Sequence, residues 1–337
     1  MKLKLEDVCE RGSSSLKQSD ILGMTGDYPI YGASGYIGNV DFYHQEKPYV
    51  AIVKDGAGIG RTTFHTAKSS VIGTMQYLLP KDNVLPKYLY YVVGHMHLEK
   101  YFSGATIPHI YFKDYKSEEF NYDSLDKQKN IVEILGRCEK VISARKRELE
   151  LLDSLIKARF VEMFGDVKYG SERWGGKPFK DITINLDSKR KPVKDADRKR
   201  MQGIYPYYGA TGIVDYINDY RQDGDFLLIS EDGKALELRS KPIAFLASGK
   251  IWVNNHAHVQ QCTDECNMIY LMYHINFMDI SIWVTGIDQK KLNRANLDTI
   301  PIALPPIELQ EQFAAFVHQV DKSKVVVQKA LDEAQLL

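Results

Sequence analysis

The sequence predicts an α+β fold in which two tandem α/β domains are separated by two long helices packed as an antiparallel, pseudo-twofold coiled coil. Three observations predict it: a long internal repeat, a Gly- and Tyr-rich region that begins each copy, and a long amphipathic stretch that ends each copy. Each copy spans roughly 165 residues, far more than the short repeat of a solenoid. We therefore expect two related domains in tandem.

The repeat is clearest in an eight-residue motif. Tyr28–Gly35 (Tyr-Pro-Ile-Tyr-Gly-Ala-Ser-Gly) reappears 177 positions later as Tyr205–Gly212 (Tyr-Pro-Tyr-Tyr-Gly-Ala-Thr-Gly). Six of the eight positions are identical, and a serine is exchanged for a threonine. At the same offset, Asp55-Gly56 matches Asp232-Gly233, and each pair follows an apolar run.

Three further matches lie in the same order at slowly drifting offsets. Leu5-Glu-Asp-Val8 resembles Phe179-Lys-Asp-Ile182 at an offset of 174, whereas Gly104 and Gln128 meet Gly286 and Gln310 at an offset of 182. Five ordered matches favour a duplication. A tandem pair of this kind suits a partner that is itself nearly twofold, such as a DNA duplex.

The repeat divides the chain into four parts. We expect a first domain at 1–124, a helix at 125–165, a second domain at 166–304 and a second helix at 305–337. Asp123 or Ser124 suits the N-cap of the first helix, and Gly165 suits its C-terminal end. The stretch 165–176 is predicted to link the two copies.

Both helices carry an apolar seam whose members recur about every 3.5 residues, as in a coiled coil. At 1.5 Å per residue, the first helix would span about 57 Å and could act as a spacer between the domains. The alternative is that each helix covers only its own domain. The predicted pairing and partner-docking residues are Ile131, Leu135, Ile142, Leu149, Leu152 and Ile156 in the first helix and Phe313, Val317, Val320, Val327 and Leu331 in the second.

Composition excludes several classes of protein. The 337 residues contain 44 basic and 44 acidic side chains, so a histone-like or tail-driven nucleic-acid binder is excluded, and any contact with a polyanion must come from local patches. No long apolar run predicts a membrane helix, and the N-terminus lacks the core of a signal peptide. Because only four cysteines are present, we expect a reduced, cytoplasmic protein without contact with a membrane.

Catalytic and metal-binding motifs are missing. No methyltransferase Asn/Asp-Pro-Pro-Tyr/Phe tetrapeptide and no phosphate-binding Gly-x-x-x-x-Gly-Lys-Ser/Thr loop occurs, and Gly56–Gly60 is interpreted as a tight turn between strands. The order His256, His258, Cys262, Cys266 fits no common zinc site, so two loop histidines and two half-buried cysteines are expected there. We predict neither catalytic residues nor a metal site, which is typical of a recognition protein.

Several local motifs, in this order and duplicated, resemble the specificity (S) subunit of type I restriction–modification systems, and the resemblance covers essentially the whole chain. The motifs are Leu5–Val8, the two Tyr-Pro repeats, Asp55-Gly56 followed by Ile59-Gly60, and the domain-to-helix junctions 124–131 and 304–313. The second junction, Leu-Pro-Pro-Ile-Glu-Leu-Gln, resembles the start of the family's spacer helices. The first junction lacks the double proline, and Asp232-Gly233 lacks the glycine-rich continuation, so the two domains are expected to read different sequences.

The resemblance implies two target-recognition domains, each reading one half of a bipartite double-stranded DNA target through the major groove. The helices would set the half-site spacing and dock two modification subunits, which carry S-adenosylmethionine and methylate adenine. Two restriction (motor-nuclease) subunits would join for cleavage. S-adenosylmethionine, Mg²⁺ and ATP are therefore expected in the partner subunits, and no cofactor is expected in this chain.

Candidate DNA contacts are polar side chains in predicted turns, suited to phosphates or base edges, with asparagine suited to adenine. The basic stretch Lys189–Lys191 would follow the DNA backbone. The alternatives are that each tyrosine belongs to a strand core, that each cation is a solvated loop charge, and that the Tyr-Gly-Ala-Ser/Thr-Gly element is a structural turn. The candidates are Tyr31, Ser34, Lys54, Arg61 and Thr62 in the first domain and Lys189, Arg190, Lys191, Tyr208, Thr211, Lys234, Arg239, Lys250, Asn254, Asn255 and His256 in the second.

Three other functions remain as alternatives. A catalytic restriction enzyme with a fused recognition half is disfavoured, because methyltransferase and nuclease motifs are missing. A coiled-coil assembly protein that binds no nucleic acid would leave the Gly- and Tyr-rich domains unexplained. An S-like subunit of a combined restriction–methylation enzyme is not separable from a type I subunit by sequence.

Overall fold

A computed structural model describes residues 1–104, 108–167 and 173–336 of the chain. The chain divides into two compact units, which we call unit 1 (Met1–Val141) and unit 2 (Ile142–Leu337). Within the predicted linker 165–176, residues 168–172 lie outside the described residues. Over the three described ranges, no helix is both long and apolar enough to cross a membrane.

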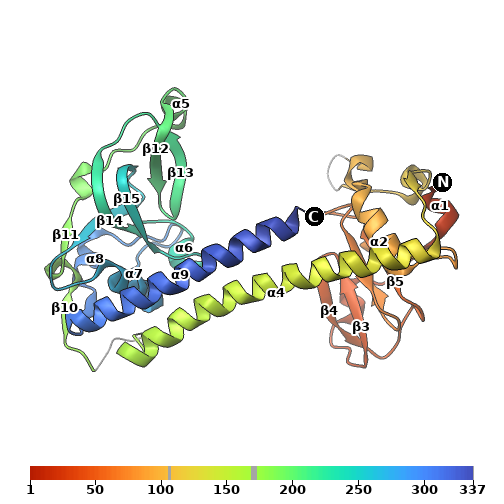
Figure 1. Ribbon diagram of the computed structural model, residues 1–337, viewed down its shortest axis with the longest axis horizontal. Coiled ribbons are helices and arrows are strands. Elements are labelled where there is room, and N and C mark those ends of the chain that lie inside the picture. Colours follow the sequence, from red (N-terminus) through yellow and green to blue (C-terminus); the bar gives the residue numbers. More distant parts are fainter. Residues whose placement is uncertain (105–107, 168–172, 337) are drawn as a thin grey trace. The chain divides into compact units, whose positions relative to one another are not determined.

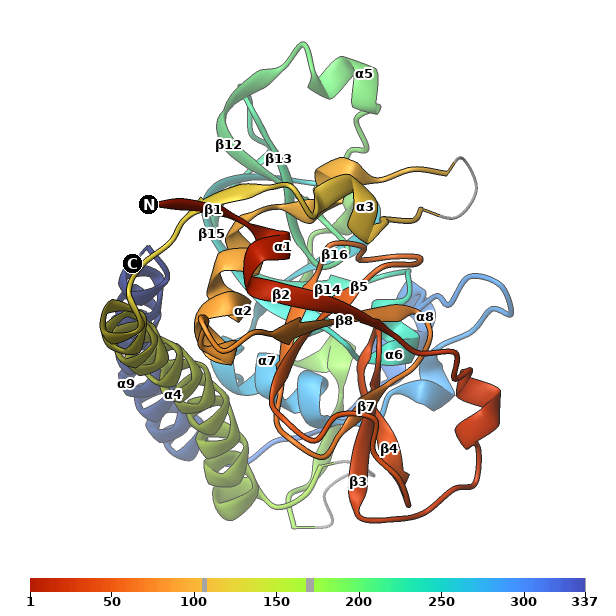
Figure 2. The same cartoon turned by 90° about the vertical axis from the view of Figure 1, so that its right-hand side faces the viewer.

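Unit 1 is built on a four-stranded antiparallel sheet in the order β2-β8-β5-β6, next to a three-stranded sheet in the order β4-β3-β7 (Figure 2). A separate two-stranded antiparallel ladder, β1-β9, pairs the first strand of the unit with the last strand before α4. Its strands are β1 (Lys2–Lys4), β2 (Cys9–Ser13), β3 (Tyr28–Gly32), β4 (Gly35–Val40), β5 (Tyr49–Val53), β6 (Thr62–His65), β7 (Ser70–Val71), β8 (Met75–Pro80) and β9 (Glu119–Asn121). Its helices are α1 (Leu5–Val8), α2 (Pro86–His95), α3 (Phe112–Tyr115) and the first part of α4 (Leu125–Phe164), with 3₁₀ turns at Gln18–Ile21 and Leu98–Tyr101.

Unit 2 repeats this plan in one six-stranded sheet in the order β11-β16-β14-β15-β12-β13, with a separate β10-β17 ladder (Figure 1). Its strands are β10 (Gly176–Pro178), β11 (Thr183–Asn185), β12 (Gln202–Gly209), β13 (Gly212–Ile217), β14 (Gln222–Ser230), β15 (Ala244–Val253), β16 (Ala257–Cys262) and β17 (Pro301–Ala303). Its helices are α5 (Asp195–Arg198), α6 (Ala235–Leu238), α7 (Met268–Phe277), α8 (Arg294–Thr299) and α9 (Ile307–Gln335), with 3₁₀ turns at Phe179–Asp181, Asp187–Lys189 and Ser281–Trp283.

The two units have the same strand pairing. The β3–β4 and β12–β13 hairpins are both antiparallel with one irregularity near the tip, and each also pairs in parallel with a later strand. In those parallel pairs, Tyr31 faces Val71 and Tyr208 faces Val253. The equivalence of the two Tyr-Pro motifs that the sequence predicts is therefore structural.

The central strands β5 and β14 show why each unit needs two apolar layers. Val50 and Ile52 face a cluster that contains α2, whereas the intervening Tyr49, Ala51 and Val53 face a second cluster with β7 and β8. In β14, Leu227 and Ile229 face the α7 side, and Phe226 and Leu228 face the other. Because side chains alternate along a strand, a strand covered on both faces is continuously apolar.

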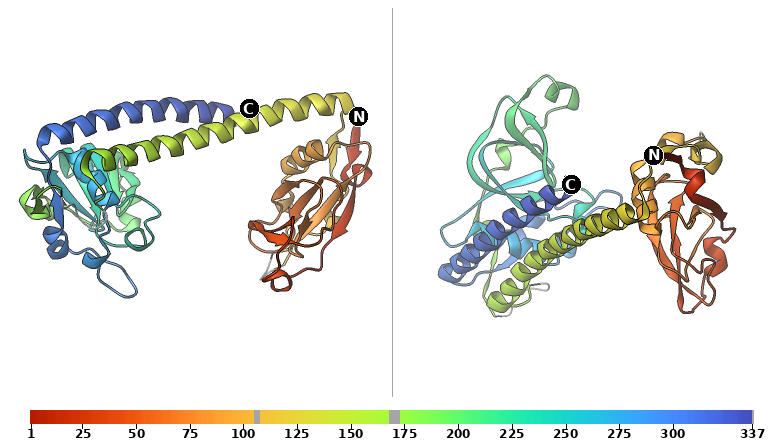
Figure 3. Two further views of the ribbon diagram at one scale, coloured as in Figure 1. Left: turned by 90° about the horizontal axis from the view of Figure 1, so that it is seen from below. Right: turned by 45° about the vertical axis from the view of Figure 1, so that its right-hand side comes forward.

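The two long helices predicted at 125–165 and 305–337 are present as α4 (Leu125–Phe164) and α9 (Ile307–Gln335), with Gly165 ending α4 at a positive φ of 89°. Within unit 2, α9 packs beside the last part of α4 (Figures 1 and 3). Phe164 meets Phe313 with ring centroids 5.6 Å apart, and further along Asp153 pairs with Lys324 at 2.6 Å. Because the residue number falls in one helix as it rises in the other, this stretch is antiparallel.

The seam residues behave differently along the two helices. Ile156, Phe313, Val317, Val320, Val327 and Leu331 are buried, whereas Ile131, Leu135, Ile142, Leu149 and Leu152 are half-buried. At its start, α4 packs on unit 1, where Ile131 and Val132 contact the cluster around α2. A pseudo-twofold relation of the complete helices, and the functional boundaries at 124, 165 and 304, stay predictions.

Candidate nucleic-acid interface

Each unit presents an equivalent hairpin tip, between β3 and β4 in unit 1 and between β12 and β13 in unit 2. The chain turns through Ala33-Ser34 in unit 1 and Ala210-Thr211 in unit 2, with glycines on both sides of each pair. Gly35 and Gly212 have φ values of 115° and 136°, which a residue with a Cβ adopts only under strain. Ser34 and Thr211 are exposed, so each tip presents a hydroxyl group at the same place.

The carbonyl group at each tip is held by a different side chain. In unit 1 the Arg61 guanidinium donates to the Ala33 carbonyl oxygen. In unit 2 the Ser230 hydroxyl donates to the Ala210 carbonyl oxygen at 2.5 Å. Arg61 and Ser34, both predicted DNA contacts, are thereby brought together at one tip. Because a guanidinium has five N–H donors, Arg61 keeps several donors for another acceptor.

The repeated aspartates each contact a histidine ring, from loops that are not equivalent in the repeat. His109 Nδ1 lies 2.6 Å from Asp55 Oδ1, and His256 Nδ1 lies 2.9 Å from an Asp232 carboxylate oxygen. Their backbones also form equivalent bridges, Asp55 with His109 and Asp232 with Lys291. His256, a predicted DNA contact, therefore holds a loop in place while its ring remains partly exposed.

A basic cavity of about 250 Å³ lies beside Asp55 in unit 1. Arg11 on β2, Lys54 after β5 and Lys113 on α3 line it together with Ser13, the buried Gln76 and Asp55, which pairs with Lys54 at 3.8 Å. Arg11 and Lys113 form no ion pair within the described residues. Three cations around one cavity, with hydroxyl and amide groups beside them, suit an anion such as a phosphate oxygen.

The position in unit 2 that corresponds to the basic cavity contains carboxylates instead of free cations. Asp187 and Glu231, the counterparts of Ser13 and Lys54, lie in a network with Arg190. Arg190 contacts Glu231 at 2.5 Å, and all three side chains are at most 16% exposed. Burial by itself would raise the pKa of Glu231, but hydrogen bonds from Arg190 and Lys291 outweigh it and lower that pKa below its ordinary value. Arg190 thus neutralises buried carboxylates.

Two further candidates have structural partners. The Arg239 guanidinium donates to three carbonyl oxygens at the end of α7, those of Ile275, Asn276 and Met278. Asn254 is 8% exposed, and its side chain accepts a hydrogen bond from the His256 backbone at 2.7 Å. These contacts define the shape of unit 2.

The two repeated tyrosines lie within the strand layer. Tyr31 is half-buried with its ring 4.3 Å from that of His65, and Tyr208 is 8% exposed in the cluster that contains Phe226. Each tyrosine therefore supports its hairpin from beneath the tip.

The remaining candidates are at least partly accessible. Lys250 lies 4.7 Å from the centre of the Tyr220 ring, and Thr62 donates to the Gly60 carbonyl at 3.3 Å. The other accessible candidates, all exposed, are Lys189, Lys191, Lys234 and Asn255. No contact with DNA is present to test any of these residues, so their role stays a prediction.

Sequence reasoning missed Arg11 and Lys113 as members of the basic cavity. Their positions on β2 and α3 carry no local signal for a shared site, because only the folded chain brings them together. The sequence did contain one signal that this place differs between the two units. At the repeat offset that aligns Asp55 with Asp232, Lys54 aligns with Glu231, so the charge is reversed.

The region 256–266 differs from the prediction. His258 is not a loop residue: it is 1% exposed on β16, with Nδ1 2.7 Å from an Asp187 carboxylate oxygen. Cys266 is buried, whereas Cys262 is half-buried as expected. Among the residues that the structure describes, no three His, Cys, Asp or Glu side chains gather as a metal site. The tight turn predicted at Gly56–Gly60 is confirmed between β5 and β6.

Comparison with known families gives one match over most of the chain. The family described as type I restriction modification DNA specificity domain matches residues 1–152 and 172–334. The two matched segments correspond to the two copies of the repeat. Each copy therefore has the sequence pattern of that domain.

Individual relatives agree with this match. A protein named as type I restriction enzyme specificity subunit S.HindORF215P, from Haemophilus influenzae, is 38% identical over 144 residues, which are 42% of this chain and 36% of the relative. The MjaIX specificity subunit of Methanocaldococcus jannaschii is 21% identical over 302 residues, covering 77% of this chain and 69% of that one. The chain thus matches about a third of the first relative's length and about two thirds of the second's.

A solved structure shares the fold. The crystal structure of a type I restriction–modification system S subunit from M. genitalium matches with a TM-score of 0.63 and 15% identity. The match covers 100% of this chain and 93% of that one. At this identity the likeness concerns the fold alone.

Proposed function

The chain belongs to the family of type I restriction modification DNA specificity domains, and we propose that it is the DNA-recognition subunit of a type I restriction–modification complex. Each unit would read one half of a bipartite target. The DNA would lie against the hairpin tips and the surfaces beside Asp55 and Asp232.

One observation carries this proposal: the chain uses one backbone frame twice, with different chemistry at equivalent positions. Lys54 in unit 1 corresponds to Glu231 in unit 2, and the tip carbonyl is held by Arg61 in one unit and by Ser230 in the other. A repeated frame with different side chains is what two different half-sites require, because base identity is read by donor and acceptor patterns.

Phosphate and base contacts would have separate sites. In unit 1, Arg11, Lys54 and Lys113 form a cluster of cations that suits the DNA backbone, which positions a protein without reading sequence. The exposed Ser34 hydroxyl at the tip is small enough to approach base edges. In unit 2, Thr211 has the equivalent place at the tip.

The long helices would fix the spacing between the half-sites. Helix α4 begins in unit 1 and ends in unit 2, where it packs antiparallel to α9. A helix stiffened by such packing holds its length at 1.5 Å per residue. The exposed apolar residues Ile134, Val141, Val325 and Val326 offer contact surface for modification subunits on these helices.

Chemistry would come from the partners. Two modification subunits would methylate adenine with S-adenosylmethionine, and two restriction subunits would supply ATP- and Mg²⁺-dependent translocation and cleavage. The chain itself would contribute sequence recognition without a catalytic residue.

Methylome sequencing of cells that express the chain with its modification subunits tests the proposal. We expect methylated adenines in two short half-sites separated by unread positions of fixed number. Ser34→Ala should relax one half-site, and Thr211→Ala should relax the other. A continuous motif, or one substitution that changes both half-sites, would contradict the proposal.

A further inference from the structure

Two phenylalanines near the end of α4 complete the core of unit 2. Phe160 and Phe164 are fully buried, and the Phe160 ring stacks on that of Tyr270 at 5.7 Å and 13°. Phe164 meets the same tyrosine at 4.8 Å. Four side chains from α7 and α9 surround the two rings: Tyr270, His274, Phe277 and Phe313.

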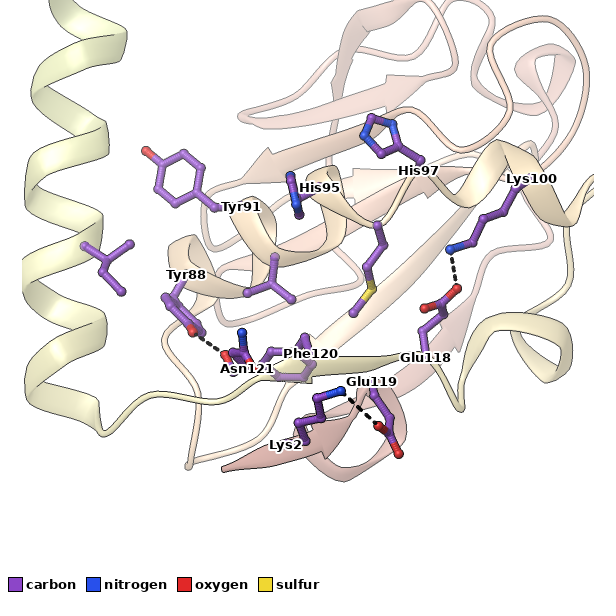
Figure 4. A pocket seen from close by; sticks show the side chains of 13 residues that line it. Lys2, Tyr88, Tyr91, His95, His97, Lys100, Glu118, Glu119, Phe120 and Asn121 are labelled. Atoms are coloured by element: carbon purple, nitrogen blue, oxygen red, sulfur yellow. Dashed lines mark hydrogen bonds and ion pairs between the residues drawn. The ribbon is translucent and has the colours of Figure 1, made fainter. Parts of the chain in front are cut away.

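Unit 1 has the same pocket without an occupant. At the offset of 182 that aligns α2 with α7 and the start of α4 with that of α9, the four counterparts are Tyr88, Val92, His95 and Ile131. All four line one pocket of about 720 Å³ between α2, β9 and α4 (Figure 4). We call it the α2 pocket.

Burial confirms that this pocket is open. Tyr270, His274 and Phe313 have no exposed surface in unit 2. Of the counterparts in unit 1, Tyr88 is buried as well, at 4% exposed, but Val92 and Ile131 are half-buried and His95, in the place of Phe277, is exposed. Unit 1 therefore keeps an apolar hollow that its own residues do not fill, which is typical of an interaction site.

We propose that the α2 pocket binds an α-helix of a partner protein that presents two aromatic side chains four residues apart. The occupied pocket in unit 2 defines this chemistry, since Phe160 and Phe164 lie one turn apart on one face of a helix. Phe164 packs beside Phe313 on the antiparallel α9, so the partner helix would run antiparallel to α4 and place an aromatic ring beside Ile131.

The wall of the pocket also predicts the polarity of the partner. His95, His97 and Lys100 replace Phe277, Asp279 and Ile282 of unit 2, so one wall becomes more polar, with Lys100 paired to Glu118 and Lys2 paired to Glu119 (Figure 4). In unit 2 the Lys157 ammonium lies 5.9 Å from the Phe277 ring centre. Lys157 precedes the first aromatic by three residues. In the partner helix we expect a polar side chain at that position, opposite the His95 ring.

A second copy of this chain is a poorer occupant. Its own aromatic pair, Phe160 and Phe164, is buried in the core of its unit 2 and would have to leave it. The inference does not depend on DNA recognition, because it rests on the repeat and on the open pocket alone.

A peptide that copies residues 150–165 of α4 is a suitable probe for the full-length chain. A lactam between positions 154 and 158, which are exposed in α4, holds the peptide helical. We expect saturable binding of the labelled peptide, measured by fluorescence anisotropy. The double substitution Phe160→Ala and Phe164→Ala in the peptide should weaken binding at least tenfold.

Filling the pocket provides the protein controls. Val92→Trp and His95→Trp should each weaken binding at least tenfold, whereas Ile134→Trp, on the exposed face of α4, should leave binding unchanged. Thermal melting by circular dichroism checks that each variant folds. Absence of binding by the helical peptide, binding insensitive to both pocket variants, or a concentration-dependent dimer that either pocket variant abolishes would overturn the proposal.

Discussion

Gln128 on α4 and Gln310 on α9 hold equivalent positions and make the same three hydrogen bonds to the main chain. Each Oε1 accepts from the backbone N–H just before the domain helix, that of Leu85 or of Asn267, at 2.8 Å. Each Nε2 donates to two backbone carbonyl oxygens. Neither side chain has exposed surface, so each glutamine fastens a long helix to its unit.

Replacing either glutamine by leucine should destabilise the unit to which it belongs. The change leaves one N–H without its partner and removes a donor from two carbonyl oxygens, of which, within the described chain, only Asn83 O keeps another, the Tyr122 hydroxyl. We therefore expect a loss of about 2–4 kcal/mol in the free energy of unfolding. Urea denaturation followed by hydrogen exchange assigns the loss to a unit: unit 1 for Gln128→Leu and unit 2 for Gln310→Leu. The exposed Gln312→Leu is the control, and an equal loss there would refute the assigned role.

Stability should depend on pH through the Arg190 network. The pKa values of Asp187 and Glu231 lie below their ordinary values, because hydrogen bonds and charges from His258, Arg190 and Lys291 outweigh the effect of burial. A lowered carboxyl pKa contributes stability above the unfolded value of about 4, and that stability is lost as pH falls through the folded value.

We therefore expect Glu231→Gln to lower the free energy of unfolding by about 3 kcal/mol at pH 7, since it removes the nearer of the two carboxylates that Arg190 contacts and leaves only Asp187, at 3.4 Å. The difference from the parent should shrink as the pH falls below about 4. Denaturation at several pH values measures it, with the exposed Glu237→Gln as control. A difference independent of pH would show that the charge of Glu231 does not act this way.

The basic cavity of unit 1 should contribute to the salt dependence of DNA binding by the assembled complex. Arg11→Ala and Lys54→Ala should each reduce the slope of log K against log [salt] by about 1, because each removes one phosphate contact. Fluorescence titration over a range of KCl concentrations gives the slope. Lys322→Ala, on the exposed face of α9, should leave it unchanged. Unchanged slopes for both cavity variants would exclude the cavity as a phosphate site.

Shortening α4 by one heptad should change the spacing of the target. Deleting residues 143–149 removes about 10.5 Å and keeps the seam in register, so we expect half-sites of unchanged sequence about three base pairs closer together. Deleting only five residues turns the following seam by about 140° to another face, and methylation should then be lost. Methylome sequencing distinguishes the outcomes, and altered half-site letters at constant spacing would count against the spacer role.

The aromatic pocket of unit 2 should be important for its stability. Phe160→Ala leaves a cavity among Tyr270, Phe277 and Phe313, and we expect a loss of about 3–5 kcal/mol. The neighbouring Val161 is 41% exposed, so Val161→Ala should change stability by less than about 0.5 kcal/mol. Thermal or chemical denaturation compares the two, and equal effects would disprove the packing role of Phe160.

Features that depend on local pattern could be predicted from the sequence. The bounds of α4 followed from the periodic seam and from Gly165, and the equivalence of the hairpins followed from the Tyr-Pro repeat. Both signals lie in short, contiguous stretches of the chain. They survive in the folded state because caps, periodicity and tight turns are local physical constraints.

Features that depend on distant contacts could not be predicted. The Arg239 side chain was predicted to contact DNA, but its guanidinium donates to carbonyl oxygens at the end of α7. Those residues are 36 or more positions away in the sequence. Arg11 and Lys113 meet at one cavity although about a hundred positions separate them in sequence. Only tertiary packing decides whether such a cation is structural or free.

The paired glutamines have a consequence for how such chains diversify. In each unit a glutamine in the first turns of the following long helix, Gln128 or Gln310, makes the same hydrogen bonds to the main chain of that unit. A genetic crossover at this junction therefore joins a foreign unit to the resident helix with the fastening intact. If each unit reads one half-site, as proposed above, the exchange of a whole unit between related chains would change that half-site and leave the junction with the helix unchanged.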